Sequence, residues 1–179
     1  LCRSVCDRPP GHPDRRPRTP GAGKADANDE DGWTRLANGE VLTLDVHRLP
    51  QQNTPAERYS PITGKWTSAG TAPNILVDAY DNEIGPAVRL PNGNIFQVGA
   101  DPCGPGNCSA HTAIYSPSGT WTAGPDFPPI DGKFYSVDDG PAAVLPTSNV
   151  LVQASPPYTC GGESGILMPS CPPSHFFEF

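Results

Sequence analysis

The sequence predicts an all-β protein built from an internal repeat. Apolar runs are only about five to seven residues long, and no window has the 3.6-residue apolar period of a helix. The phrase GWTRLANGEVLTLDV at 32–46 recurs as GPAVRLPNGNIFQVGA at 85–100 and as GPAAVLPTSNVLVQAS at 140–155. The matching apolar positions lie 54 and 55 residues apart: Val41, Ile95 and Val150. A fixed period of this size indicates a repeat architecture.

Each repeat opens with a predicted hairpin. Residues 33–37 and 41–46 are expected as strands because Asn38-Gly39 lies between two apolar runs, and both residue types tolerate the positive φ of a tight turn. The second and third repeats supply the same pair of strands, at 86–90 with 95–100 and at 141–145 with 150–155.

A second strand pair follows each hairpin. In the first repeat a strand ends at Tyr59, and after the turn at 60–65 another opens with Trp66. In the second repeat, 111–115 ends at Tyr115, and the turn at 116–120 leads to Trp121, 55 residues after its counterpart. We expect both indoles to be largely buried where neighbouring repeats meet. The third repeat supplies 174–179 and lacks the Trp-bearing fourth strand.

Four antiparallel strands in about 50 residues describe a propeller blade. The phrases ERYSPITGKWTSAG and AIYSPSGTWTAGPDFP, each followed by one of the hairpin phrases, resemble bacterial kelch-type blades of the galactose-oxidase-like propeller class. One departure is plain, because the double glycine that often ends the second kelch strand is replaced at Asp45-Val46, Gly99-Ala100 and Ala154-Ser155. The resemblance implies an all-β, partial kelch-like β-propeller.

The expected organisation has two parts. Residues 1–31 carry almost no apolar side chains and are expected to be a disordered or linker segment. Residues 32–179 are expected to form an incomplete propeller, with blades at about 32–70, 85–124 and 140–179. Fewer than three full blades cannot close a ring, so we expect a fragment of a longer propeller, or one completed by blades of the same or another chain.

The charge distribution excludes one class of partner. Residues 1–30 hold six basic and five acidic side chains, whereas the rest of the chain holds six and fourteen. An acidic body repels phosphate backbones, which argues against nucleic acid. No run approaches the roughly 20 apolar residues of a membrane span.

The six cysteines fall into three local pairs: Cys2/Cys6, Cys103/Cys108 and Cys160/Cys171. The second and third pairs occupy the same loop in successive blades, between the second and third strands. We expect both to be disulfides, which favours a secreted or periplasmic location. A zinc site using Cys103, Cys108 and His111 is the alternative.

A candidate binding face lies at the mouth of the central channel. The long connections between blades carry corresponding residues just before the innermost strands. These are Tyr80 with Tyr135 and Glu83 with Asp138, joined by Asp81 and Asp139. Carboxylates accept hydroxyl hydrogen bonds and aromatic rings stack on sugars, so the face suits a carbohydrate or another polar ligand. Two alternatives are a Ca²⁺ site and carboxylates that only cap turns.

The galactose-oxidase-like resemblance requires a test for a copper site. His47, His111 and His175 come from three different blades, so one ion could hardly reach all three. No catalytic residue, metal or cofactor is therefore assigned. The sequence favours a secreted scaffold or binding module for a carbohydrate or protein ligand. The alternative is part of a propeller oxidase or carbohydrate-active enzyme whose catalytic residues lie elsewhere.

Overall fold

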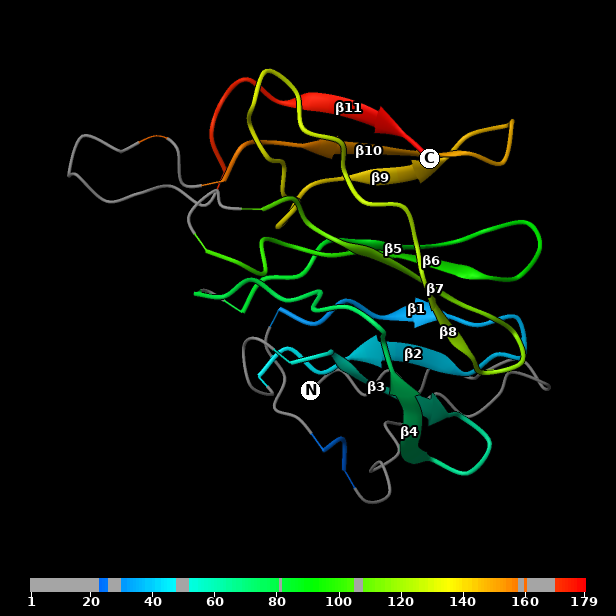
Figure 1. Ribbon diagram of the computed structural model, residues 1–179. Coiled ribbons are helices and arrows are strands. Elements are labelled where there is room, and N and C mark those ends of the chain that lie inside the picture. Colours follow the sequence, from blue (N-terminus) through cyan, green and yellow to red (C-terminus); the bar gives the residue numbers. More distant parts are fainter. Residues whose placement is uncertain are drawn as a thin grey trace, which may run out of the picture.

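The computed structural model describes residues 23–25, 30–47, 52–80, 82–104, 108–157, 160 and 170–179. All regular structure within them is β-strand and turn. Figure 1 shows three antiparallel sheets stacked in chain order, with the first sheet at the bottom of the view and the third at the top. The predicted all-β, partial propeller of four-stranded blades is confirmed.

The strands lie where the repeat places them. The first blade contains β1 (Thr34–Arg35), β2 (Val41–Leu44), β3 (Pro55–Ser60) and β4 (Lys65–Thr71). The second contains β5 (Ala87–Arg89), β6 (Ile95–Val98), β7 (Thr112–Tyr115) and β8 (Trp121–Ala123). The third contains β9 (Ala142–Val144), β10 (Val150–Ala154) and β11 (His175–Glu178). Each strand pairs with its sequence neighbour, and β1, β5 and β9 lie next to one another as the innermost strands.

The hairpin turns explain why the strands lie within the ranges that the sequence predicts. Gly39 and Gly93 have φ values of 88° and 87°, a region that glycine enters without steric cost. In the third blade Ser148 takes the same position at φ 73°, where a side chain is strained. The turn still closes, because the Leu145 N–H donates to the Asn149 carbonyl at 2.8 Å.

The core lies between the blades. Leu42 and Leu44 of the first blade pack with Ile95 of the second. The next residue, Phe96, packs instead with Val152 of the third blade. Successive strand residues point to opposite faces, and both faces of the second blade are covered. The central strand β6 is therefore buried at all four of its residues rather than at alternate ones.

Trp66 and Trp121 occupy equivalent places, because they pair in register with Tyr59 and Tyr115. Both indoles are more buried than exposed, in line with the expectation, although neither is fully enclosed. Trp121 does bridge two blades, since its Nε1 donates to the Ala69 carbonyl of β4 at 3.0 Å.

A segment before the first blade contacts that blade. The Lys24 ammonium lies 3.3 Å from Asp31 and 3.8 Å from Asp45, and all three side chains are almost fully buried. The Ala25 N–H donates to the Glu57 carboxylate of β3 at 2.9 Å. The expected linker at 1–31 stays a prediction, because most of it lies outside the described residues.

Two disulfides join the cysteines as predicted, Cys103 with Cys108 and Cys160 with Cys171. Each lies between the second and third strands of its blade. Disulfides of this kind indicate an oxidising compartment. Cys2 and Cys6 lie outside the described residues. No helix in the described part of the chain is long and apolar enough to cross a membrane.

Candidate functional site

A polar pocket of about 430 Å³ opens beside the innermost strands, between the segments that precede β5 and β9 and the end of β10. Its polar lining combines three carboxylates with four hydroxyls: Glu83, Asp138, Asp139, Ser136, Ser155, Ser170 and Ser174. The three carboxylates are among the residues that the sequence predicted at the mouth of the channel. Such a lining offers many hydrogen bonds beside the apolar surface of Val137, Pro141 and Ala154.

Backbone pairing fixes one wall of the pocket. Ser136 and Ser155 exchange two N–H to carbonyl bonds, at 2.9 and 3.1 Å, which attach the blade connection to the end of β10. Gly140 then passes so close to the strand that an added Cβ would lie 2.9 Å from the Gln153 carbonyl. A glycine is therefore needed where the connection turns into β9. This wall is therefore held by backbone hydrogen bonds and by the close approach of Gly140 to β10.

Asp138 is the most buried carboxylate of the pocket, with 6% of its surface exposed. It accepts hydrogen bonds from the Ser136 hydroxyl at 3.3 Å and the Ser170 hydroxyl at 3.0 Å. Burial raises the pKa of Asp138 to about 6, and repulsion from Asp78 and Asp101 adds to the shift, while the two hydroxyl bonds oppose it. This carboxyl therefore changes charge near neutral pH.

Two of the pocket carboxylates, Glu83 and Asp139, also form a cluster with Glu30 at the rim. Oxygen atoms of Glu30, Glu83 and Asp139 all lie within 4.8 Å of one another. Three carboxylates at this separation could hold a hard cation such as Ca²⁺, which takes oxygen ligands. Exposed acidic groups also gather without an ion, and two of these three residues are exposed.

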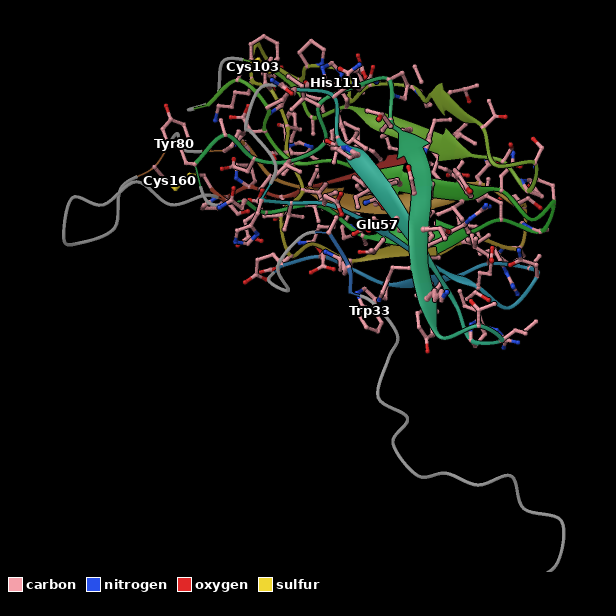
Figure 2. All side chains as sticks on the ribbon, turned by 90° about the horizontal axis from the view of Figure 1, so that it is seen from below. Trp33, Glu57, Tyr80, Cys103, His111 and Cys160 are labelled. Atoms are coloured by element: carbon pink, nitrogen blue, oxygen red, sulfur yellow. A yellow bond between two sulfur atoms is a disulfide. The ribbon has the colours of Figure 1, made fainter. Side chains whose placement is uncertain are left out.

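The two tyrosines differ in exposure. Tyr80 is 61% exposed, and Figure 2 shows it at the edge of the molecule, near Cys160 in that view. Tyr135 is 1% exposed, because its ring packs against His175 and Phe177 at centroid distances of 5.1 and 5.2 Å. The buried ring of Tyr135 offers no surface on which a sugar could stack, so of the two tyrosines only Tyr80 could serve in this way. Asp81 lies outside the described residues.

The alternative role of turn-capping applies to neighbouring aspartates. Asp78 accepts the Tyr80 N–H at 2.7 Å, and Asp101 accepts the Cys103 N–H at 3.0 Å. Both side chains are buried. Asp138 differs from them, because it accepts hydrogen bonds from two hydroxyl groups, which could reorient toward a ligand.

The metal alternatives have little support in the described residues. Cys103 and Cys108 lie within reach of Asp101, but their sulfurs form a disulfide, so neither is a thiolate ligand. His111 contacts Asp126 at 2.8 Å, and the His175 ring packs on Tyr135. In this part of the chain, no cluster of three potential ligands contains a histidine.

Sequence reasoning missed the serines that complete the pocket. Ser136 and Ser155 come together through backbone pairing between a blade connection and β10, whereas Ser170 and Ser174 lie on either side of Cys171 in the sequence. Serines are common in loops, so no residue pattern marked these four. Glu30 was assigned to the linker, and only its approach to Glu83 brings it to the rim.

No protein-family model matches the sequence, and no curated protein sequence matches it. Several solved structures match part of the chain, among them two carbohydrate-related proteins. A candidate exo-β-1,3-galactanase from Bifidobacterium bifidum S17 is 14% identical with a TM-score of 0.43, covering 72% of this chain and 45% of its own. An α-L-arabinanase from Penicillium chrysogenum, solved with arabinobiose, is 16% identical with a TM-score of 0.40, covering 68% and 39%. The chain thus spans less than half of either protein, and similarity at this level says nothing about a shared ligand or reaction.

Proposed function

We propose that the chain is part of a secreted, kelch-like propeller that binds a neutral, hydroxyl-rich ligand, such as an oligosaccharide, in the pocket beside Asp138. The observation that carries the proposal is the lining of that pocket. Carboxylates accept hydrogen bonds from sugar hydroxyls, whereas serine hydroxyls both donate and accept them. A pocket of about 430 Å³ lies in the size range of small-ligand sites. The two disulfides support an extracellular location.

Binding should depend on the Ser170 hydroxyl. This exposed serine lines the pocket and donates to Asp138, so Ser170→Ala removes one pocket hydroxyl without opening the core. We expect about three- to tenfold weaker binding, the cost of one lost hydrogen bond to a ligand or to Asp138. A glycan array followed by titration calorimetry identifies the ligand and measures the loss.

Ser118→Ala is the matched control. Ser118 lies in the turn between β7 and β8, where its hydroxyl contacts the Ser116 hydroxyl at 2.7 Å, and it does not line the pocket. This variant should bind like the unaltered protein. Equal affinities for both variants would reject the pocket as the site, and no binding to any glycan by the folded protein would reject the ligand class.

A carbohydrate-active enzyme is the second candidate, and one observation favours it. A carboxyl group with a pKa of about 6 can be protonated and ready to act as a general acid, and Asp138 shares its pocket with the carboxylates of Glu83 and Asp139. Hydrolysis of an aryl glycoside that Asp138→Asn abolishes would favour the enzyme. Saturable binding without turnover would favour the binding module.

A further inference from the structure

A small pocket of about 120 Å³ lies between the first and second blades, among their tight turns. Leu36 comes from the turn between β1 and β2, Gly93 from the turn between β5 and β6, and Pro117 from the turn between β7 and β8. These turns lie at the opposite strand ends from the blade connections that form the pocket beside Asp138. Both blades have all four strands, so the walls of this pocket require no further blade.

Tyr115 of β7 lines this small pocket, although only 2% of its surface is exposed. Its ring packs against that of Trp121 at a centroid distance of 4.9 Å, and its hydroxyl lies at the turn after β7, where a Cβ added to Gly119 would lie 3.5 Å from it. The hydroxyl oxygen is not enclosed by protein atoms, and among the described residues it has no hydrogen-bond partner. A tyrosine hydroxyl in a buried side chain usually has one, so this donor is open to a ligand.

Arg58 of β3 brings a positive charge to the same pocket. It pairs in register with Leu42, which packs in the core between the first two blades, so both side chains leave the sheet on that face. The Arg58 Nε donates to the Thr67 hydroxyl at 3.4 Å and lies 3.9 Å from the Glu40 carboxylate. The two terminal nitrogens have no hydrogen-bond partner in the described part of the chain. Such a pair of nitrogens can donate side by side to both oxygens of a carboxylate.

Glu40 does not occupy the place of such a ligand. The Asn38 amide donates to the Glu40 carboxylate at 2.9 Å, and the Glu40 N–H donates to the Asn38 side-chain oxygen at 3.0 Å. These bonds hold Glu40 within its own turn, and Glu40 does not line the pocket. The pocket lining thus contains a guanidinium and no carboxylate, whereas the pocket beside Asp138 contains three carboxylates.

We propose that this small pocket binds the carboxylate of a short aliphatic acid, such as acetate or propionate. The terminal nitrogens of Arg58 pair with the carboxylate, and the Tyr115 hydroxyl donates to one of its oxygens. The apolar walls at Leu36 and Pro117 contact the alkyl group. The volume of about 120 Å³ is below the roughly 300 Å³ at which sites for larger ligands begin, so the occupant is small. This site is independent of the ligand proposed for the pocket beside Asp138.

The test titrates the intact, isotope-labelled chain with sodium acetate at constant ionic strength and follows the backbone amide signals by NMR. Acetamide, a neutral compound of nearly the same shape, is the matched ligand. Acetate should shift the amide signals of Gly93 and Arg58 saturably, with a dissociation constant of about 1 to 10 mM, because so small a ligand makes few contacts. Acetamide should bind at least about tenfold more weakly, because it lacks the charge that Arg58 recognises. Equal binding of the two compounds would overturn the proposal.

Three variants locate the site. Tyr115→Phe keeps the buried ring but removes the hydroxyl, and should weaken acetate binding about three- to tenfold. Arg58→Gln removes the charge and should weaken it at least about tenfold. Lys133→Gln removes a positive charge from an exposed residue that does not line the pocket, and should bind acetate like the unaltered protein.

The amide spectra also show whether each variant is folded. Equal acetate affinities for folded Arg58→Gln and Lys133→Gln would place the binding elsewhere and overturn the proposal. The absence of saturable shifts in the unaltered protein would overturn it without any variant.

Discussion

At the scale of single residues, Asp138 should make stability depend on pH. Its pKa is about 6 in the folded protein and 3.8 in the unfolded chain, so the fold favours the neutral carboxyl. Stability contributed in this way is complete below about pH 4 and is lost as the pH rises through 6. The loss approaches about 3 kcal/mol in total.

Asp138→Asn removes this titration while keeping the shape of the side chain. The free energy of unfolding of the variant, relative to the unaltered protein, should therefore rise between pH 4 and pH 7. Urea unfolding at several pH values measures the difference. Parallel curves for the two proteins would show that the carboxyl titrates normally.

The pocket residues could be predicted from the sequence only in part. Glu83, Asp138 and Asp139 were expected at the mouth of the channel, and all three line the pocket. Tyr80 and Tyr135 have equivalent places in the repeat but opposite exposure. Tyr135 is buried because Phe177 of β11 packs against it. A repeat spacing fixes the backbone position, whereas local packing decides which way a ring points.

At the scale of strands, prediction succeeded because turns and periodicity are local signals. Hairpin turns such as Asn38-Gly39 and Asn92-Gly93 fixed the strand ends to within about two residues. The pairing of Ser136 with Ser155 carried no such signal, because it joins an irregular connection to β10. The fold was thus largely predictable and the pocket only in part.

Trp121 should contribute more to stability than Trp66, although both open a fourth strand. The Trp121 indole packs against the first blade and donates to the Ala69 carbonyl. The Trp66 ring contacts Trp33 and Tyr59 of its own blade, at 5.6 and 5.4 Å. We expect Trp121→Ala to cost about 2–3 kcal/mol and Trp66→Ala about 1. Equal losses in urea unfolding would mean that the bridge between blades adds nothing.

At the scale of the whole molecule, the first and third blades differ on one face. This is the face that each blade turns toward the part of the chain that precedes it in the sequence. At equivalent positions of this face, the third blade has Val152 and Phe177, both buried against the second blade. The first blade has Thr43 and Glu57 there. These polar side chains are buried too, beneath the segment around Lys24. Within the described residues, this face of the first blade is therefore covered through ion pairs and hydrogen bonds rather than through apolar packing.

The attachment of this segment to the first blade should depend on Lys24. Its ammonium faces the buried carboxylates of Asp31 and Asp45, and Asp31 also accepts the Thr43 hydroxyl at 3.0 Å. Lys24→Met keeps much of the side-chain volume but removes the charge, so two buried carboxylates lose a partner. We expect a loss of about 3 kcal/mol in the free energy of unfolding, because breaking a buried ion pair leaves desolvated charge behind.

Lys65→Met controls for the general effect of removing a positive charge from this acidic protein. Lys65 is exposed at the start of β4, so its substitution should change the free energy of unfolding by less than about 0.5 kcal/mol. Hydrogen exchange adds a local readout, because the Ala25 amide that donates to Glu57 should exchange faster in the Lys24 variant alone. If both variants unfold at the same urea concentration, the contacts of Lys24 do not hold the segment on the first blade, and the polar face there must be stabilised by its own hydrogen bonds.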